Sequence, residues 1–106
     1  MKTLIVTALI LISSLTYAAE FTNLQAVELS NSIAYSAEMI MQGRQQGVAI
    51  DKAMSVKVDP KIQKIITLII IEAYKAPLMP TKKLKEEVTR EFKTRIFVLT
   101  YENLTK

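Results

Sequence analysis

The sequence predicts an all-α protein, a small bundle of three main helices plus one short helix, which follows a cleavable signal peptide. Apolar residues recur at helical spacing in three segments of the chain. Capping residues, prolines and a glycine mark the ends of these segments, as they do at helix boundaries. The chain offers no pair of alternating segments that could form neighbouring strands, so we do not expect a sheet.

The first 18 residues have the layout of a secretory signal peptide. One lysine precedes an uncharged run from Thr3 to Leu15, and small or polar residues follow. The apolar core is shorter than the roughly 20 residues that span a bilayer. We expect cleavage after Ala18, with Thr16 at the −3 position, and a single helical domain over residues 19–106. The mature chain is then expected in the periplasm or secreted from a bacterium, without a transmembrane span.

Composition limits how the exported domain is held together. The chain contains no cysteine, so core packing must replace disulfides. Charge is divided unevenly, because residues 19–51 carry four acids and one base while residues 52–106 carry twelve bases and six acids. The basic half is either simply a solvated surface or a surface that attracts an acidic partner or a membrane.

The first main helix is expected over about residues 22–46. Gly47 follows it and can adopt the left-handed conformation that closes a helix, while Gly43 allows a neighbour to approach closely. The predicted buried face consists of small or apolar side chains and one methylene stem: Ala26, Leu29, Ile33, Ala37, Ile40 and Arg44. The next segment, 48–58, has mixed spacing, and we expect a short helix followed by a loop there.

A central apolar helix is expected from Lys61 to Ala76. Asp59 is the predicted N-cap, Pro60 occupies the first helical position, and Pro77 forces the helix to stop. Its uncharged run is far too short for a membrane anchor, and a strand there would lack a partner. The predicted core face consists of Ile62, Ile65, Ile66, Ile69 and Ala73.

The last helix is expected over about residues 82–102, with Thr81 as its N-cap. Three lysines lie in its first turn, where the helix dipole disfavours them, so they are either tolerated or mark the place where an anionic partner binds. The predicted buried face consists of Leu84, Val88, Phe92, Ile96 and Leu99.

The sequence excludes most catalytic chemistry. The absence of histidine and cysteine removes the common nucleophile pairs and nearly all zinc sites. Two glycines cannot build a phosphate-binding loop, and the carboxylates of Glu86, Glu87 and Glu91 each have a base within one turn. We therefore expect no enzyme activity and no catalytic, cofactor or metal site, and export argues against a nucleic-acid partner.

Five residues are candidates for contact with a partner. The aromatic ring of Tyr74 lies on a weaker face of its helix and either lines a groove or borders the core. Met79 lies in the proline-rich connector, where we expect it to be the exposed methionine, whereas Met41 and Met54 are expected in the core. The remaining candidates are the lysines at the start of the last helix, Lys82, Lys83 and Lys85.

Three segments, "IMQGRQQGVAI", "IIIEAYKAP" and "EEVTREFKTRIF", resemble a group of small exported bacterial proteins associated with phage and prophage regions. The resemblance implies a small helical secreted fold and no established function. A structural role at a helix end, in helix packing or at a kink explains all of the matching residues, which are Arg44, Gln45, Gly47, Ala73, Tyr74 and Pro77. The group usually carries two cysteines, and this chain has Leu99 and Thr100 where the second would fall.

These observations favour a non-catalytic interaction protein of the periplasm, with an envelope or periplasmic protein as its partner. Two alternatives remain open, a chaperone that responds to acid stress and a protein resembling a toxin-immunity protein. A weak homodimer also remains open.

Overall fold

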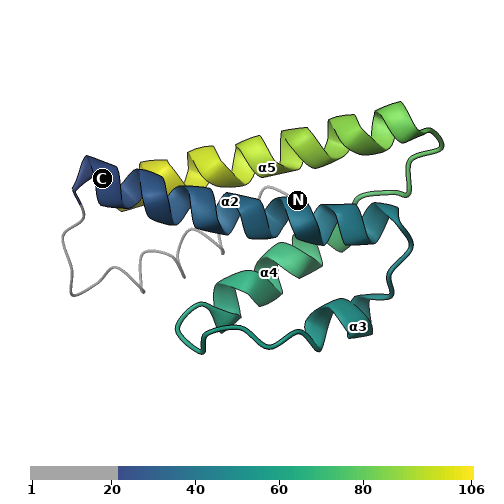
Figure 1. The fold of residues 1–106 in the computed structure, drawn as a ribbon, viewed down its shortest axis with the longest axis horizontal. Helices are drawn as coiled ribbons and strands as arrows, with labels where there is room; N and C mark the ends of the chain where they lie inside the picture. Colours follow the sequence, from purple (N-terminus) through teal and green to yellow (C-terminus); the bar gives the residue numbers. More distant parts are fainter. Residues whose placement is uncertain (1–21) are drawn as a thin grey trace.

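The computed structural model describes residues 22–106, which form four helices (Figure 1) and no strand. The predicted fold class, an all-α bundle of three main helices and one short helix, is confirmed. The predicted signal peptide and its cleavage site lie outside the described residues. The helices are α2 (Asn23–Gln45), α3 (Ile50–Met54), α4 (Gln63–Tyr74) and α5 (Lys82–Leu104).

Helix α2 organises the bundle. Helix α5 runs antiparallel along one side of α2, and α4 crosses α2 on the other side, with α3 beside α4 (Figure 1). Helices α4 and α5 each approach α2 more closely than they approach one another. Within residues 22–106, no helix combines the length and the apolar character that crossing a bilayer requires.

Both ends of α2 carry strong capping signals. At its start, the Thr22 hydroxyl accepts a hydrogen bond from the Gln25 N–H (3.1 Å), and the Gln25 side-chain oxygen accepts one from the Thr22 N–H (3.0 Å). At its end, Gly47 has φ +86°, which confirms the predicted left-handed glycine. The Val48 N–H then reaches the Gly43 carbonyl (2.9 Å) and the Gly47 N–H reaches that of Arg44 (3.1 Å), a Schellman motif.

Alanine substitutions at the two glycines should have opposite effects on stability. Gly47→Ala is expected to cost about 1–2 kcal/mol, because a Cβ disfavours the left-handed conformation. Gly43→Ala is expected to gain up to about 1 kcal/mol, because helical alanine is favoured over glycine and its Cβ would lie an ordinary 3.8 Å from Val48. Urea unfolding followed by circular dichroism measures both, and a loss of stability in Gly43→Ala would contradict this packing.

Helix α4 is the buried central helix that the sequence predicts, but it begins later and ends earlier than predicted. Ile65, Ile66, Ile69 and Ala73 of the predicted face are buried, and Ile62 is half-buried. Asp59 does not cap α4, which corrects the predicted start. Instead its carboxylate accepts from the Lys61 N–H (2.9 Å) and its carbonyl from the Ile62 N–H (3.0 Å). Asp59 thus forms a local turn, the alternative that aspartate side chains favour.

The buried faces of α2 and α5 are rotated relative to the predicted stripes. On α5, Phe92 and Ile96 are buried as expected, but Leu84 is exposed, and Thr89 and Thr100 are buried instead. The two threonine hydroxyls donate to carbonyls one turn earlier in their own helix, each at 2.7 Å. Because this bond satisfies the hydroxyl, threonine can occupy an interior position. On α2, Ala26, Ile33 and Ala37 are buried as expected, but Leu29, Ile40 and Arg44 are only half-buried, and Ser30 and Gln45 are buried instead.

Candidate binding groove

The C-terminal end of α2 is fastened to the connector that follows α4. Gln45 is only 3% exposed, and its side-chain amide donates to the Pro77 carbonyl (3.0 Å) and accepts from the Met79 N–H (2.8 Å). Beside it, the Arg44 guanidinium donates to the Ala76 carbonyl (3.0 Å), and the Lys85 ammonium donates to the Gln45 carbonyl (2.7 Å). We call these hydrogen bonds around Gln45 the clasp.

Tyr74 lies next to the clasp, at the edge of an apolar groove. Its hydroxyl donates to the Val48 carbonyl (2.8 Å), and the Arg44 guanidinium lies 5.4 Å from the centre of its ring, within cation–π range. These contacts, together with the left-handed Gly47, provide structural reasons for most of the residues that carry the resemblance.

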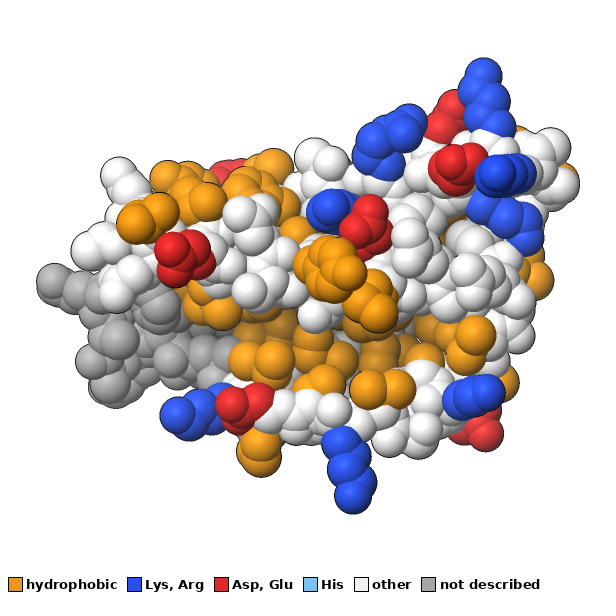
Figure 2. All heavy atoms as spheres, in the orientation of Figure 1, with side chains coloured by type: hydrophobic (Ala, Val, Ile, Leu, Met, Phe, Trp, Pro, Cys, Tyr) orange, Lys and Arg blue, Asp and Glu red, His pale blue; other side chains and the backbone are white. Residues whose placement is uncertain are grey.

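An apolar groove of about 340 Å³ lies between α2, α3, α4 and the segment after α3. Figure 2 shows apolar side chains gathered on this side of α2, along the seam with α3 and α4. The groove-lining residues are Ser36, Met39, Ile40, Gly43, Val48, Lys52, Ala53, Val56, Val58, Ile66, Ile70 and Tyr74. We call this feature the apolar groove.

The polar groups in the lining of the apolar groove are already engaged, apart from one ammonium. The Tyr74 hydroxyl donates to Val48, and the Ser36 hydroxyl donates to the Ser32 carbonyl (3.2 Å). Among the described residues that line the groove, Lys52 is the only charged one, and it is exposed on α3. The groove therefore suits a hydrocarbon group, with a cation at its edge, since an unpaired polar group of a ligand would lose its hydrogen bonds there.

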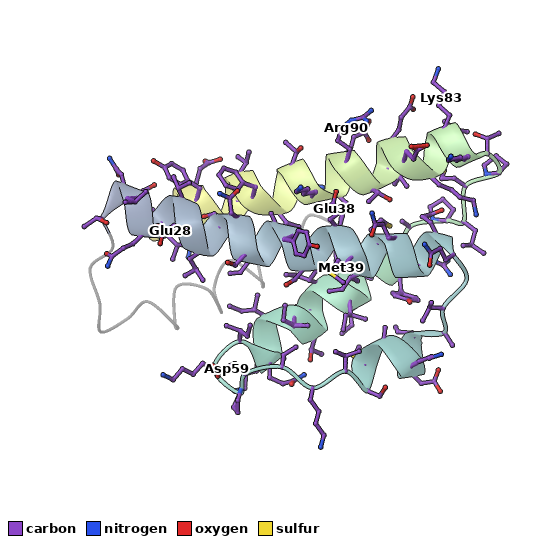
Figure 3. All side chains as sticks on the ribbon, viewed as in Figure 1. Glu28, Glu38, Met39, Asp59, Lys83 and Arg90 are labelled. Carbon is purple, nitrogen blue, oxygen red and sulfur yellow. The ribbon has the colours of Figure 1, made fainter. Side chains whose placement is uncertain are left out.

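Exposed apolar side chains extend the groove outward. Met39 is 55% exposed and Val56 is 62% exposed, and both line the groove. Met39 projects from α2 on the side that faces α4 (Figure 3). Tyr35 is also exposed and lies one helical turn before Met39, so the two share a face of α2. Apolar surface of this kind commonly marks an interaction site.

The structure divides the five sequence-predicted partner residues. It brings Tyr74, Met79 and Lys85 together around the clasp, where their hydrogen bonds are internal. Met79 is half-buried, which corrects the prediction that it is the exposed methionine; Met39 is more exposed. The reason is that the Met79 N–H is held by the buried Gln45 side chain. Met41 is buried, and Met54 is half-buried against the core.

Lys82 and Lys83 lie on the exposed first turn of α5, and Lys82 lines a hollow together with Gln45 and Lys85 of the clasp. A shallow hollow there is bordered by Lys82, Lys83, Glu86, Glu87 and Arg90, so opposite charges are interspersed. The Thr81 hydroxyl accepts from the Leu84 N–H (3.2 Å), which confirms the predicted cap. Because opposite charges alternate around this hollow, they do not build a concentrated anion site. In residues 22–106, no three acidic side chains gather as a metal site would require.

Sequence reasoning did not identify Met39, Lys52 and Val56 as candidates. Lys52 and Val56 lie in the stretch whose spacing predicted only a short helix and a loop, and their role depends on where that segment packs. A signal for Met39 was available, because it lies four residues after Tyr35 on the same face of the helix.

Comparison with known proteins gives no relative. No family model matches the chain, and no significant match was found among curated proteins or solved structures.

Proposed function

We propose that this chain is an exported, non-catalytic binding protein of the bacterial envelope, and that the apolar groove is its binding surface. The observation that carries the proposal is a groove already formed in the fold, with apolar walls and exposed apolar side chains at its edge. The resemblance to exported, phage-associated proteins agrees with this role, and a phage or prophage origin is part of the proposal.

The chemistry of the lining supports binding rather than catalysis. A hydroxyl nucleophile is commonly activated by a base within hydrogen-bond reach. The Ser36 hydroxyl instead donates to a backbone carbonyl of its own helix, and the Tyr74 hydroxyl donates to Val48. The remaining functional group in the lining is the Lys52 ammonium, which is exposed and suited to holding a negative charge.

The clasp supports the same proposal because it fixes the walls of the groove. Tyr74 and Val48 both line the groove, and their hydrogen bond joins α4 to the segment after α2. Arg44 and Gln45 then hold the connector that leaves α4. A binding surface held by such contacts needs little ordering when its partner arrives, which favours affinity.

Photocrosslinking in bacterial cells tests the proposal. A benzophenone amino acid replaces Val56 at the edge of the groove, and in a control chain it replaces Arg90, which is also exposed but lies on α5 (Figure 3). We expect a discrete crosslinked product from position 56 and none from position 90. The first residue of the recovered chain is expected to be Ala19, as export with cleavage requires.

Addition of a groove-filling substitution completes the test. Ser36→Leu places a larger apolar side chain in the lining, and Ser32→Leu makes the same change one turn away at an exposed position outside it. The product from position 56 should disappear in Ser36→Leu and persist in Ser32→Leu. Equal products from positions 56 and 90, or no product at all, would contradict the proposal.

A further inference from the structure

We propose that the apolar groove holds the alkyl chain of a single-chain anionic amphiphile, such as a fatty acid, with the Lys52 ammonium beside its acidic head group. The inference rests on the proposed function and names the class of ligand for the same groove.

The size of the groove suits one alkyl chain. Its volume of about 340 Å³ lies near the lower end of ordinary small-molecule sites. At about 30 Å³ for each water-sized group, this volume accommodates about eleven such groups. A chain of ten to twelve carbon atoms has that number of groups in one continuous line.

The lining favours an alkyl chain over a peptide in extended conformation. An extended peptide presents backbone N–H and C=O groups that lose free energy when they are buried without partners. The hydroxyls of Ser36 and Tyr74 already donate to backbone carbonyls. The side chains of Ile66 and Ile70 form the wall on α4, and they are almost fully buried there. A saturated chain requires only such contacts.

Charge around the groove favours an acidic head group. Lys52 is the one charged residue that the described part of the chain, residues 22–106, contributes to the lining. The segment that borders the groove and leads into α4, residues 51–64, carries four lysines and two aspartates. An anionic head group beside Lys52 would be attracted to its ammonium, whereas a cationic head group would be repelled.

Calorimetric titration of the purified protein with dodecanoate tests the inference, at concentrations below micelle formation. Dodecyltrimethylammonium, with the same chain and the opposite charge, is the matched ligand. We expect dodecanoate to bind one per chain and more tightly than the cation. Lys52→Glu should lower the affinity for dodecanoate by about fivefold or more and raise the affinity for the cation, because it reverses the charge at the edge of the groove. Lys83→Glu makes the same change on α5 and should alter neither affinity (Figure 3).

The groove-filling pair provides the second readout. Ser36→Leu should abolish the binding of both ligands, and Ser32→Leu should leave it intact, with circular dichroism confirming that both variants are helical. Dodecanoate binding that Ser36→Leu does not change would overturn the inference. Absence of dodecanoate binding, while an amphipathic peptide binds and Ser36→Leu removes that binding, would overturn the inference and leave the proposed function standing. If neither dodecanoate nor the peptide binds, and no crosslinked product forms at position 56, both the inference and the proposed function are overturned.

Discussion

Replacing Phe92 with alanine is expected to lower the free energy of unfolding by about 3–5 kcal/mol. Phe92 is 1% exposed and belongs to the core cluster that α2, α4 and α5 build together. Its removal takes away the largest fully buried side chain among residues 22–106 and leaves a cavity between helices. A domain of this size has a total stability of about 4–13 kcal/mol, so the loss is a large part of the whole.

Urea unfolding followed by circular dichroism measures this effect, and Phe97→Ala is the matched control on the same helix. Phe97 is half-buried and stacks on Tyr101, with ring centres 6.1 Å apart. Because it leaves no interior cavity, its alanine variant should lose less than half as much stability as Phe92→Ala. Equal losses in the two variants would contradict the position of the core on α5.

Replacing Gln45 with leucine is expected to cost about 2–4 kcal/mol, because it removes the two clasp hydrogen bonds that the Gln45 side chain makes. The Pro77 carbonyl would lose its donor and the Met79 N–H its acceptor. Leucine has a similar size and is apolar, so a site that needed only hydrophobic packing would accept it. The measurement is again the free energy of unfolding in urea.

Gln46→Leu is the control for this prediction, at the next position along the chain. Gln46 is exposed, and its role at the end of α2 uses the backbone N–H, which bonds to the Gln42 carbonyl (2.9 Å). Its leucine variant should therefore stay within about 0.5 kcal/mol of the wild type. If Gln45→Leu lowers the free energy of unfolding as little as Gln46→Leu does, the clasp does not hold the connector in solution.

Local signals in the sequence predicted the helices well. Thr81 caps α5 as predicted, because its hydroxyl acts on an N–H group within the first turn of its own helix. Gly47 ends α2 for an equally local reason, its freedom to adopt positive φ. The buried isoleucines of α4 were also predictable, since a segment with so much apolar surface is stable only when enclosed.

Features that depend on how helices meet were not predictable from spacing alone. The burial of Thr89 and Thr100 follows from the rotation of α5 against α2, and hydrophobicity does not report that rotation. Asp59 carries a capping side chain, yet the same side chain can form a local turn, and the turn is what forms.

The apolar groove illustrates the same limit. Met39 and Ile70 lie 31 residues apart and line one groove only because α4 crosses α2. Lys52 and Val56 complete it from a short segment whose sequence pattern was mixed. Tyr74 was predicted to lie at a groove or at the edge of the core, and it borders the groove while its hydroxyl bonds internally.

The central claim is that the folded protein carries an open apolar groove between α2, α3 and α4, and titration with 1-anilinonaphthalene-8-sulfonate tests it most directly. We expect the native, helical protein to bind one dye molecule with enhanced fluorescence, Ser32→Leu to do the same, and Ser36→Leu to lose the signal. Dye fluorescence that rises only as the helices unfold, or that is equal in Ser36→Leu and the wild type, would contradict the claim.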